Sequence, residues 1–194
     1  EIEFANGSYQ SKSDPELRLS HKELASKLGS TGGPVIGSAS VDPEGAGGAY
    51  STQICDIEID PETGKTDVIR YTIAQDVGTA IHPSYVEGQM QGAVAQCIGW
   101  ALNEEYFFDD DGAMVNSSFL DYRMPTSLDL PEIETIIVEV PNPGHPFGVR
   151  GVGEVPIVPG VATVANAIHD ALGIRLRTTP MNAGSILSAL KAKK

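Results

Sequence analysis

The sequence predicts an α+β fold in two layers, with helices packed on a mixed or antiparallel sheet. Strand patterns joined by short turns occur in pairs, and separate helical patterns lack the strand–helix–strand repetition of parallel α/β proteins. The 194 residues suffice for one domain or two small ones. We expect residues 1–47 to form a hairpin, a short helix and a linker of a larger fold, and residues 48–194 to form a C-terminal subdomain.

The composition excludes several classes of partner. Acidic residues outnumber basic ones 26 to 13, and the net charge of −13 argues against nucleic acid or an anionic membrane as partner. Cys55 and Cys97 form no metal-binding spacing, so this chain alone cannot hold an iron–sulfur cluster, which needs four such ligands. We find no apolar run approaching the roughly 20 residues of a bilayer span and no signal peptide, and we therefore expect a cytoplasmic protein.

The N-terminal residues predict a hairpin and a capped helix. Ile2 and Phe4 alternate with polar residues before Asn6-Gly7, the pair that favours a type I′ turn. A short helix follows, with Ser20 as N-cap and a capping box that includes a glutamate three residues later, ending at Gly29. Residues 30–48 are rich in Gly, Ser and Pro, and so long a loop indicates either function or contact with structure outside the chain.

Regular elements fill most of the remaining sequence. Strands over 49–60 and 66–76 alternate apolar and polar residues around an Asp-Pro-Glu-Thr-Gly turn, which predicts a long antiparallel hairpin. The β-branched stretch 133–140 predicts a further strand. Apolar periodicity predicts helices over 84–105, 160–172 and 182–191, the second of them ending at a glycine C-cap.

The first long helix carries a stripe of glycines. Gly88, Gly92, Gln96 and Gly99 lie at i, i+4, i+8 and i+11, which places them on one helical face. Each glycine costs about 1 kcal/mol relative to alanine in a helix. A group that lies very close to this face must offset that loss. It is either another helix or strand, or a flat ligand to which Gln96 offers its amide.

The loop at residues 144–159 contains four glycines, three prolines and a single acid, Glu154. Glycine allows unusual backbone angles, and proline stiffens the chain, so such a loop is suited to placing one carboxylate. The alternative is that Glu154 caps the following helix, where the macrodipole favours an acid.

Five segments in register resemble the C-terminal part of the molybdenum hydroxylases, the family of xanthine dehydrogenase, aldehyde oxidoreductase, aldehyde oxidase and carbon monoxide dehydrogenase. The resemblance runs from residue 49 to about residue 190. The segments are Cys-Asp-Ile-Glu-Ile-Asp-Pro-Glu-Thr-Gly at 55–64, Asp-Val-Gly-Thr-Ala-Ile-His-Pro at 76–83, Gly-Gln-Met-Gln-Gly-Ala-Val-Ala-Gln at 88–96, Leu-Asp-Tyr-Arg-Met-Pro at 120–125, and Gly-Val-Gly-Glu at 151–154 before an apolar helix.

The resemblance implies roles for particular residues. Residues 48–194 would form the C-terminal molybdopterin-binding subdomain, with Glu154 as the active-site base for oxidation of an aldehyde, purine or N-heterocycle with water-derived oxygen. Gln96 would hydrogen-bond the pterin, and Gly92 and the main chain of Gly151, Val152 and Gly153 would lie against it. The metal would take its ligands from the pterin and none from this chain.

The resemblance also implies cofactors and partners. Molybdopterin, with or without a cytosine nucleotide, would pass electrons to [2Fe–2S] clusters and FAD on partner domains or subunits. The family's molybdenum-binding part is several times longer than this chain. We therefore expect an N-terminal molybdopterin-binding partner and an isolated chain that is inactive. The chain is either a separate subunit or an excised piece. The alternative functions are a non-catalytic assembly module and an enzyme similar to carbon monoxide dehydrogenase.

Three other residues near these motifs keep two interpretations each. Arg150 would meet a pterin phosphate or a substrate carboxylate, or else form an ordinary salt bridge. Phe147 and Tyr122 would line the path of the substrate, or else belong to the core.

Overall fold

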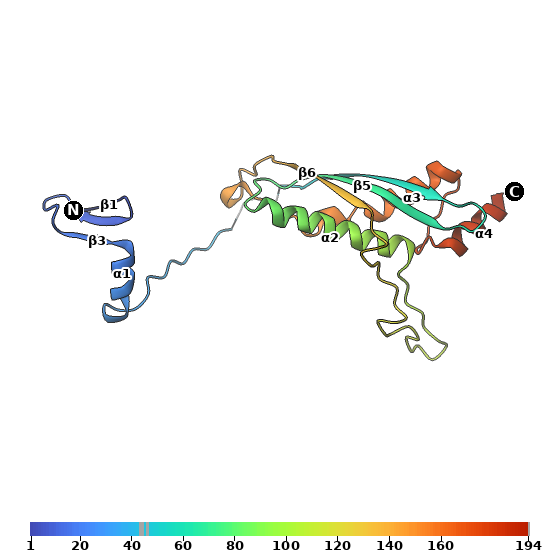
Figure 1. Cartoon of the computed structure of the whole chain (residues 1–194), viewed down its shortest axis with the longest axis horizontal. Helices are drawn as coiled ribbons and strands as arrows, with labels where there is room; N and C mark the ends of the chain where they lie inside the picture. Colours follow the sequence, from blue (N-terminus) through green and yellow to red (C-terminus); the bar gives the residue numbers. More distant parts are fainter. Residues whose placement is uncertain (43–44, 46, 194) are drawn as a thin grey trace. The chain divides into compact units, whose positions relative to one another are not determined.

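The computed structural model describes residues 1–42, 45 and 47–193, in two compact units, Glu1–Asp42 and Pro43–Lys194 (Figure 1). Residues 43, 44 and 46 of the expected loop 30–48 lie outside the described residues, as does Lys194. The proposed division into parts at residue 47 remains a prediction. Each unit is described by itself.

The first unit is a small antiparallel sheet followed by a helix. Its elements are β1 (Ile2–Ala5), β2 (Ser8–Ser11), β3 (Arg18–Ser20), α1 (His21–Lys27) and the 3₁₀ turn η1 (Leu28–Ser30). The turn at Asn6 and Gly7 has positive φ at both residues, as a type I′ turn requires, and the capping box at Ser20 is present. The strand β3 was not predicted. Of the described residues of this unit only Ser8 is buried, so the unit shows no apolar core of its own.

The second unit places helices on one face of a mixed sheet. The strand order is β4-β5-β6, with β4 and β5 antiparallel and β5 and β6 parallel. The elements are β4 (Ser51–Ile59), β5 (Thr66–Asp76), α2 (Pro83–Leu102), β6 (Glu132–Val138), the 3₁₀ turns η2 (Pro146–Gly148) and η3 (Val155–Ile157), α3 (Gly160–Leu172) and α4 (Ala183–Lys193). The predicted α+β class with a two-layer mixed sheet is confirmed.

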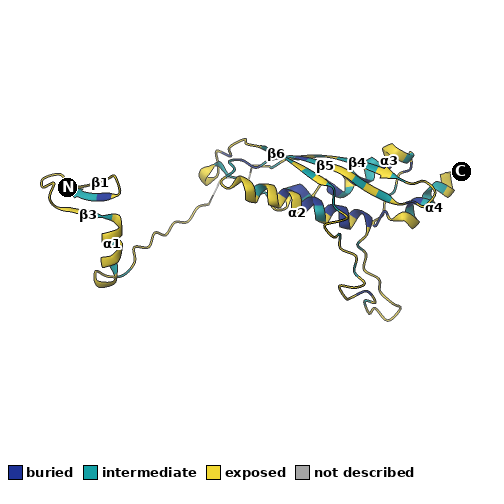
Figure 2. Ribbon diagram, viewed as in Figure 1, coloured by how far each residue is buried: buried dark blue, intermediate teal, exposed yellow. Residues whose placement is uncertain are grey.

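The core of this unit lies between the central strand and two helices. Tyr71 and Ile73 of β5 belong to one buried cluster with residues of α2 and α3, including Val94 and Ile168. Figure 2 shows the buried positions concentrated along α2. The other face of the sheet is open, and Ile54 and Ile136 on it are exposed. The alternation seen in the sequence therefore separates a covered face from an open one.

One stretch of the described residues, Val155–Leu172, reaches 18 residues with a mean hydropathy of 1.2, enough for a membrane span by length and composition alone. The expectation that no run approaches that length was therefore too strong. The stretch comprises η3 and α3, and Val164 and Ile168 of α3 are fully buried in the core of the unit. Burial against the sheet accounts for these apolar positions.

The start of α3 lies very close to α2. A Cβ atom added at Gly160 would overlap the side chain of Cys97, and the Cys97 thiol donates a hydrogen bond to the Ile157 carbonyl at 3.3 Å. Glycine at the first position of α3 therefore lets the two helices approach at this point, and the chain leading into α3 rests on α2.

The two thiols predict a pH-dependent stability. Burial raises the pKa of Cys97 from 9.0 to about 11 and, with the charge of Asp56 as a smaller cause, that of Cys55 from 9.0 to about 12. Both folded pKa values exceed the unfolded value. The contribution of the two neutral thiols to the stability of the folded chain is therefore complete below pH 9 and is lost as the pH rises through about 11. Urea midpoints should fall over this interval more steeply for the native chain than for Cys55→Ala/Cys97→Ala. Identical slopes, or rapid thiol labelling of the folded chain at pH 8, would contradict this expectation.

Candidate functional site

The entrance to the loop that carries Glu154 is held by a largely buried ion pair. The Nε atom of Arg150 lies 3.1 Å from Oδ2 of Asp76, and the two side chains are only 12% and 13% exposed. The same guanidinium donates hydrogen bonds to the carbonyls of Gly48, at 2.7 Å, and Val140, at 3.3 Å. The salt-bridge interpretation of Arg150 is therefore the one the structure supports, since Nε and Nη1 both contact protein groups.

Backbone contacts also hold the entrance of this loop at Arg150. The N–H groups of Arg150 and Thr79 donate to the carbonyls of Val77, at 3.1 Å, and Gly148, at 2.9 Å. Gly78 has φ of 66°, and a Cβ atom there would overlap the Gly148 carbonyl. Only glycine fits this position, so the Asp-Val-Gly motif and the 144–159 loop pack backbone against backbone.

The exit from the loop is fastened to both layers of the fold. The Gln53 side chain on β4 donates to the Pro156 carbonyl, and the Tyr71 hydroxyl donates to Oε1 of Gln53 at 2.6 Å. The Cys97 thiol holds the next carbonyl, that of Ile157. We did not predict the role of Gln53. Its signal in the sequence is a polar residue on the face of β4 that otherwise turns towards the core.

Glu154 lies between these two fastened ends. Its side chain is exposed, and although it is the N-cap residue of η3, it makes no side-chain capping hydrogen bond. The helix α3 starts later, with Pro159 as its N-cap. The capping interpretation of Glu154 is therefore not supported, and the carboxylate is free to contact a group outside the described chain.

The backbone beside Glu154 presents a row of donors. Among the hydrogen bonds found for residues 1–42, 45 and 47–193, none uses the N–H groups of residues 151–154. Gly151 and Gly153 are exposed, whereas the Val152 side chain packs against the core cluster. Val152 thus anchors the loop and leaves its main chain for a ligand. Successive free N–H groups in a glycine loop suit an anionic group.

The loop runs along one face of α2. A Cβ atom at Gly153 would lie 3.3 Å from Nε2 of Gln89. Gln89, Gly92 and Gln96 follow at i, i+3 and i+7, and they therefore share this face. Gln96 lines a cavity of about 600 Å³ together with Ile157, so the structure brings the predicted glutamine and the loop together. Gly92 instead lines a separate hollow of about 450 Å³.

The glycine stripe divides into a packed part and a bare part. At Gly99 a Cβ atom would overlap Pro125, so a neighbouring segment explains that glycine. At Gly88 and Gly92 a Cβ atom would meet no described atom within 4 Å. No element of the described chain packs closely on these two turns. The exposed amide of Gln96 and the free N–H groups of the loop suit an anionic group, whereas the bare backbone at Gly88 and Gly92 lines the separate hollow.

The two aromatic candidates differ in their surroundings. The Tyr122 hydroxyl donates to Oε2 of Glu104 at 2.6 Å, and this bond is the main cause that raises the pKa of Tyr122, with burial a smaller one. Phe147 is 83% exposed and has a left-handed backbone with φ of 57°. The expectation that Phe147 belongs to the core was therefore wrong, and the loop holds a bulky side chain outward in an unfavourable conformation.

Comparison with known proteins identifies the class. The sequence model of the molybdopterin cofactor-binding domain matches residues 1–131. The carbon monoxide dehydrogenase large chain of Afipia carboxidovorans is 34% identical over 145 residues, which cover 75% of this chain and 17% of that protein. The putative xanthine dehydrogenase molybdenum-binding subunit of Escherichia coli is 36% identical over 134 residues, covering 69% and 18%.

A solved structure agrees with these sequences. Quinoline 2-oxidoreductase from Pseudomonas putida 86 superposes with a TM-score of 0.78 at 29% identity, over 98% of this chain and 26% of that one. The chain belongs to the molybdopterin cofactor-binding domain family of the molybdenum hydroxylases. It spans less than a fifth of the length of the two sequence relatives. The matched residues 1–131 contain Gln96 and Gly92, whereas the loop with Glu154 follows them.

The buried ion pair predicts a large loss of stability when one partner is removed. Asp76→Asn leaves the Arg150 charge buried and unpaired, and we expect the free energy of unfolding of the chain to fall by roughly 3 kcal/mol in urea titrations. The matched control is Asp67→Asn, which breaks the exposed pair with Lys65 and should cost less than about 1 kcal/mol. Equal effects of the two substitutions would show that the Asp76 pair does not fasten the loop.

Proposed function

We propose that this chain is the C-terminal part of the molybdopterin-binding portion of a molybdenum hydroxylase that oxidises an aldehyde, purine or N-heterocycle with oxygen from water. The observation that carries the proposal is the position of Glu154. Its carboxylate is exposed and uncapped, on a loop that is fastened at both ends and lies against the glutamine face of α2. Such rigid placement of one acid is what a general base requires.

Glu154 takes a proton, at a carboxylate oxygen, from the water-derived nucleophile that attacks the substrate carbon. When bound, the molybdenum–pterin group supplies the two-electron redox chemistry and Lewis acidity. A positioned general base typically contributes 10²- to 10⁴-fold to the rate. The fastened loop ends limit the movement of the backbone that carries the carboxylate, so the position of this residue is set before substrate arrives.

The cofactor is held by donors of this chain on one side. The Gln96 amide and the N–H groups of Gly151, Val152 and Gly153 offer hydrogen bonds, and the bare backbone at Gly92 allows a flat ring to approach. Among the described residues, no three His, Cys, Asp or Glu side chains are grouped to hold a metal ion. We propose that the metal takes its ligands from the pterin, whose nucleotide form stays open.

The remaining parts of the enzyme lie outside this chain. Since the relatives are several times longer, an N-terminal molybdopterin-binding part completes the site, and the isolated chain is inactive. Electrons leave through [2Fe–2S] clusters and FAD on partner domains or subunits. Two of the similar proteins are named for xanthine and quinoline, which are both N-heterocycles, and this favours an N-heterocycle as substrate. The similarity to a carbon monoxide dehydrogenase large chain favours carbon monoxide as the second candidate.

Substitution of the proposed base tests the assignment directly. Glu154→Gln in the assembled enzyme should lower kcat by roughly 100-fold or more, because the amide cannot accept the proton. Molybdenum content, measured by mass spectrometry of the metal, should stay at the level of the unmodified enzyme. Glu58→Gln, on the open face of the sheet, is the control. Near-normal turnover of Glu154→Gln would remove the base assignment and favour a non-catalytic assembly module.

The glycine stripe gives an independent test of cofactor binding. Gly92→Ala should stabilise the isolated chain by up to about 1 kcal/mol, because its Cβ atom meets nothing there and alanine favours the helix. In the assembled enzyme the same methyl group would overlap the cofactor and lower molybdenum content roughly tenfold.

The matched control is Glu87→Ala, on the same helix but outside the stripe, which should leave the molybdenum content unchanged. An assembled Gly92→Ala enzyme with full molybdenum content would exclude close contact of the cofactor with this face.

A further inference from the structure

The segment that links α2 to β6, residues 103–131, contains no described helix or strand and projects from the C-terminal end of α2 (Figure 1). We call it the 103–131 arm. Many of its large apolar side chains are more than half exposed. The most prominent are Tyr106, Phe107, Phe108, Phe119, Leu120 and Leu128. Phe119 and Leu120 are 92% and 94% exposed, a degree of exposure that is unfavourable for apolar side chains in water.

The arm is also strongly acidic. Its 29 residues include seven Asp or Glu residues and one basic residue, Arg123. None of the ion pairs found among the described residues involves the arm. Apolar side chains are therefore surrounded by carboxylates that the described chain does not neutralise. Such a surface complements an apolar patch with a basic rim.

Internal hydrogen bonds hold the arm in a defined shape. The buried Asn116 side chain accepts from the Phe107 N–H at 2.9 Å and donates to the Glu105 carbonyl at 2.6 Å. Tyr122 is bonded to Glu104, and its ring lies 5.4 Å from that of Tyr106. The side chains of Asn116, Tyr106 and Tyr122 are thus held before any partner binds, which lowers the entropy lost on association.

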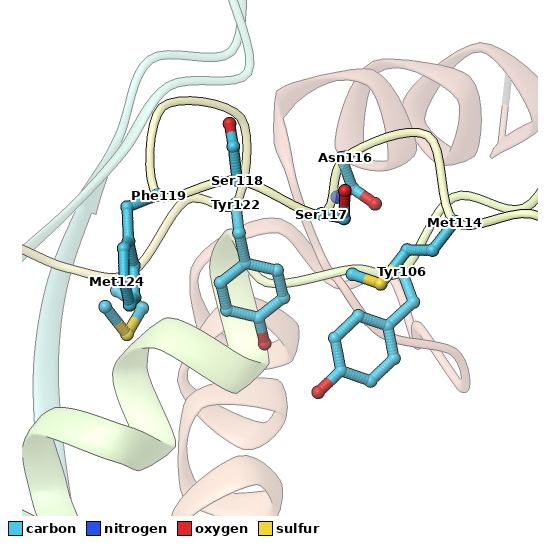
Figure 3. A pocket seen from close by; sticks show the side chains of 8 residues that line it. All are labelled: Tyr106, Met114, Asn116, Ser117, Ser118, Phe119, Tyr122 and Met124. Atoms are coloured by element: carbon cyan, nitrogen blue, oxygen red, sulfur yellow. The ribbon is translucent and has the colours of Figure 1, made fainter.

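Side chains of the arm line an open cavity of about 420 Å³ (Figure 3). Figure 3 shows Phe119 beside Met124, and the rings of Tyr122 and Tyr106 beneath the loop that carries Asn116. The wall is mostly apolar and aromatic, with Asn and Ser atoms at one side. A cavity of this kind suits an apolar or aromatic side chain as an anchor of a protein interface.

We propose that the 103–131 arm is the surface on which the remainder of the molybdopterin-binding part docks, through an apolar patch with a basic rim that inserts one side chain into this cavity. The inference rests on the proposed function. In the relatives the matching stretch is less than a fifth of a longer protein, so a large polypeptide portion lies beside it.

The negative charge of the chain and of its arm argues against other binding partners for the arm. A second copy of this chain carries the same net charge of −13 and the same acidic arm, so two arms would repel each other. Anionic lipid surfaces and nucleic acids are repelled for the same reason. A basic-rimmed protein surface is the occupant that both the apolar side chains and the carboxylates favour.

The test replaces the two most exposed neighbouring side chains. The complex is purified from the producing cells through an affinity tag on this chain, the retained polypeptide is identified by mass spectrometry, and its molybdenum is measured separately. Phe119→Ser/Leu120→Ser should reduce the retained molybdopterin-binding polypeptide roughly tenfold or more. Both side chains project into solvent, so the fold of the chain, checked by circular dichroism, should be unchanged.

The matched control is Ile54→Ser/Ile136→Ser, which removes two exposed apolar side chains, 59% and 45% exposed, from the open face of the sheet. It should retain the partner as the native chain does. Full retention by Phe119→Ser/Leu120→Ser would overturn the proposal, as would an arm-dependent dimer of the purified chain in sedimentation. If a polypeptide without molybdenum were retained in an arm-dependent way, the proposed function would be wrong, whereas the proposal that the arm is a docking surface would be supported.

Proteolysis gives a second readout. Arg123 is exposed and is the only trypsin site in the arm. Trypsin should cleave the isolated chain after Arg123 and leave this bond intact in the assembled complex. Equal cleavage in both states would show that the partner does not cover the arm.

Discussion

The ion pair between Arg150 and Asp76 is the contact on which the geometry of the candidate site depends. Removing two charges from water is costly, and the pair persists because the guanidinium also bonds the carbonyls of Gly48 and Val140. Three chain segments, far apart in sequence, therefore meet at one side chain. The Gly-Val-Gly-Glu sequence starts at the next residue, so its position is set by the sheet edge at Asp76.

The loop separates residues that fasten it from residues that face outward. Arg150, Val152 and the carbonyls held by Gln53 and Cys97 are turned into the unit, whereas Gly151, Gly153 and Glu154 are exposed. A site that acts on a small molecule needs this division, because a reactive side chain can be rigid only if its neighbours are packed. The exposed, left-handed Phe147 on the same loop fits this division, since strained backbone concentrates at functional sites.

The sequence predicted most helices and strands because their apolar periods are long, and it predicted Glu154 because a single acid stands in a glycine and proline loop. It missed β3, whose three residues carry no period, and it could not show that β6 pairs in parallel with β5. The contacts of Gln53 and Asp76 depend on tertiary approach, and the sequence signals only that Gln53 is a polar residue on the core-facing side of β4. Of the two interpretations of Phe147, the core one is wrong because its side chain is exposed, and the sequence does not show which apolar residues the chain leaves uncovered.

The glycines on the exposed face of α2 lower the stability of the isolated chain, although the same glycines leave room for a bound group. Gly88 and Gly92 each weaken the helix by about 1 kcal/mol, and no described atom approaches closely enough to offset this loss. A group that binds only the folded chain offsets it by mass action, since stabilisation grows with ligand concentration relative to its dissociation constant. The same reasoning applies to the first unit, which buries almost nothing by itself. On the proposed function, the two glycines that look unfavourable in this chain are explained by a group that binds its folded state.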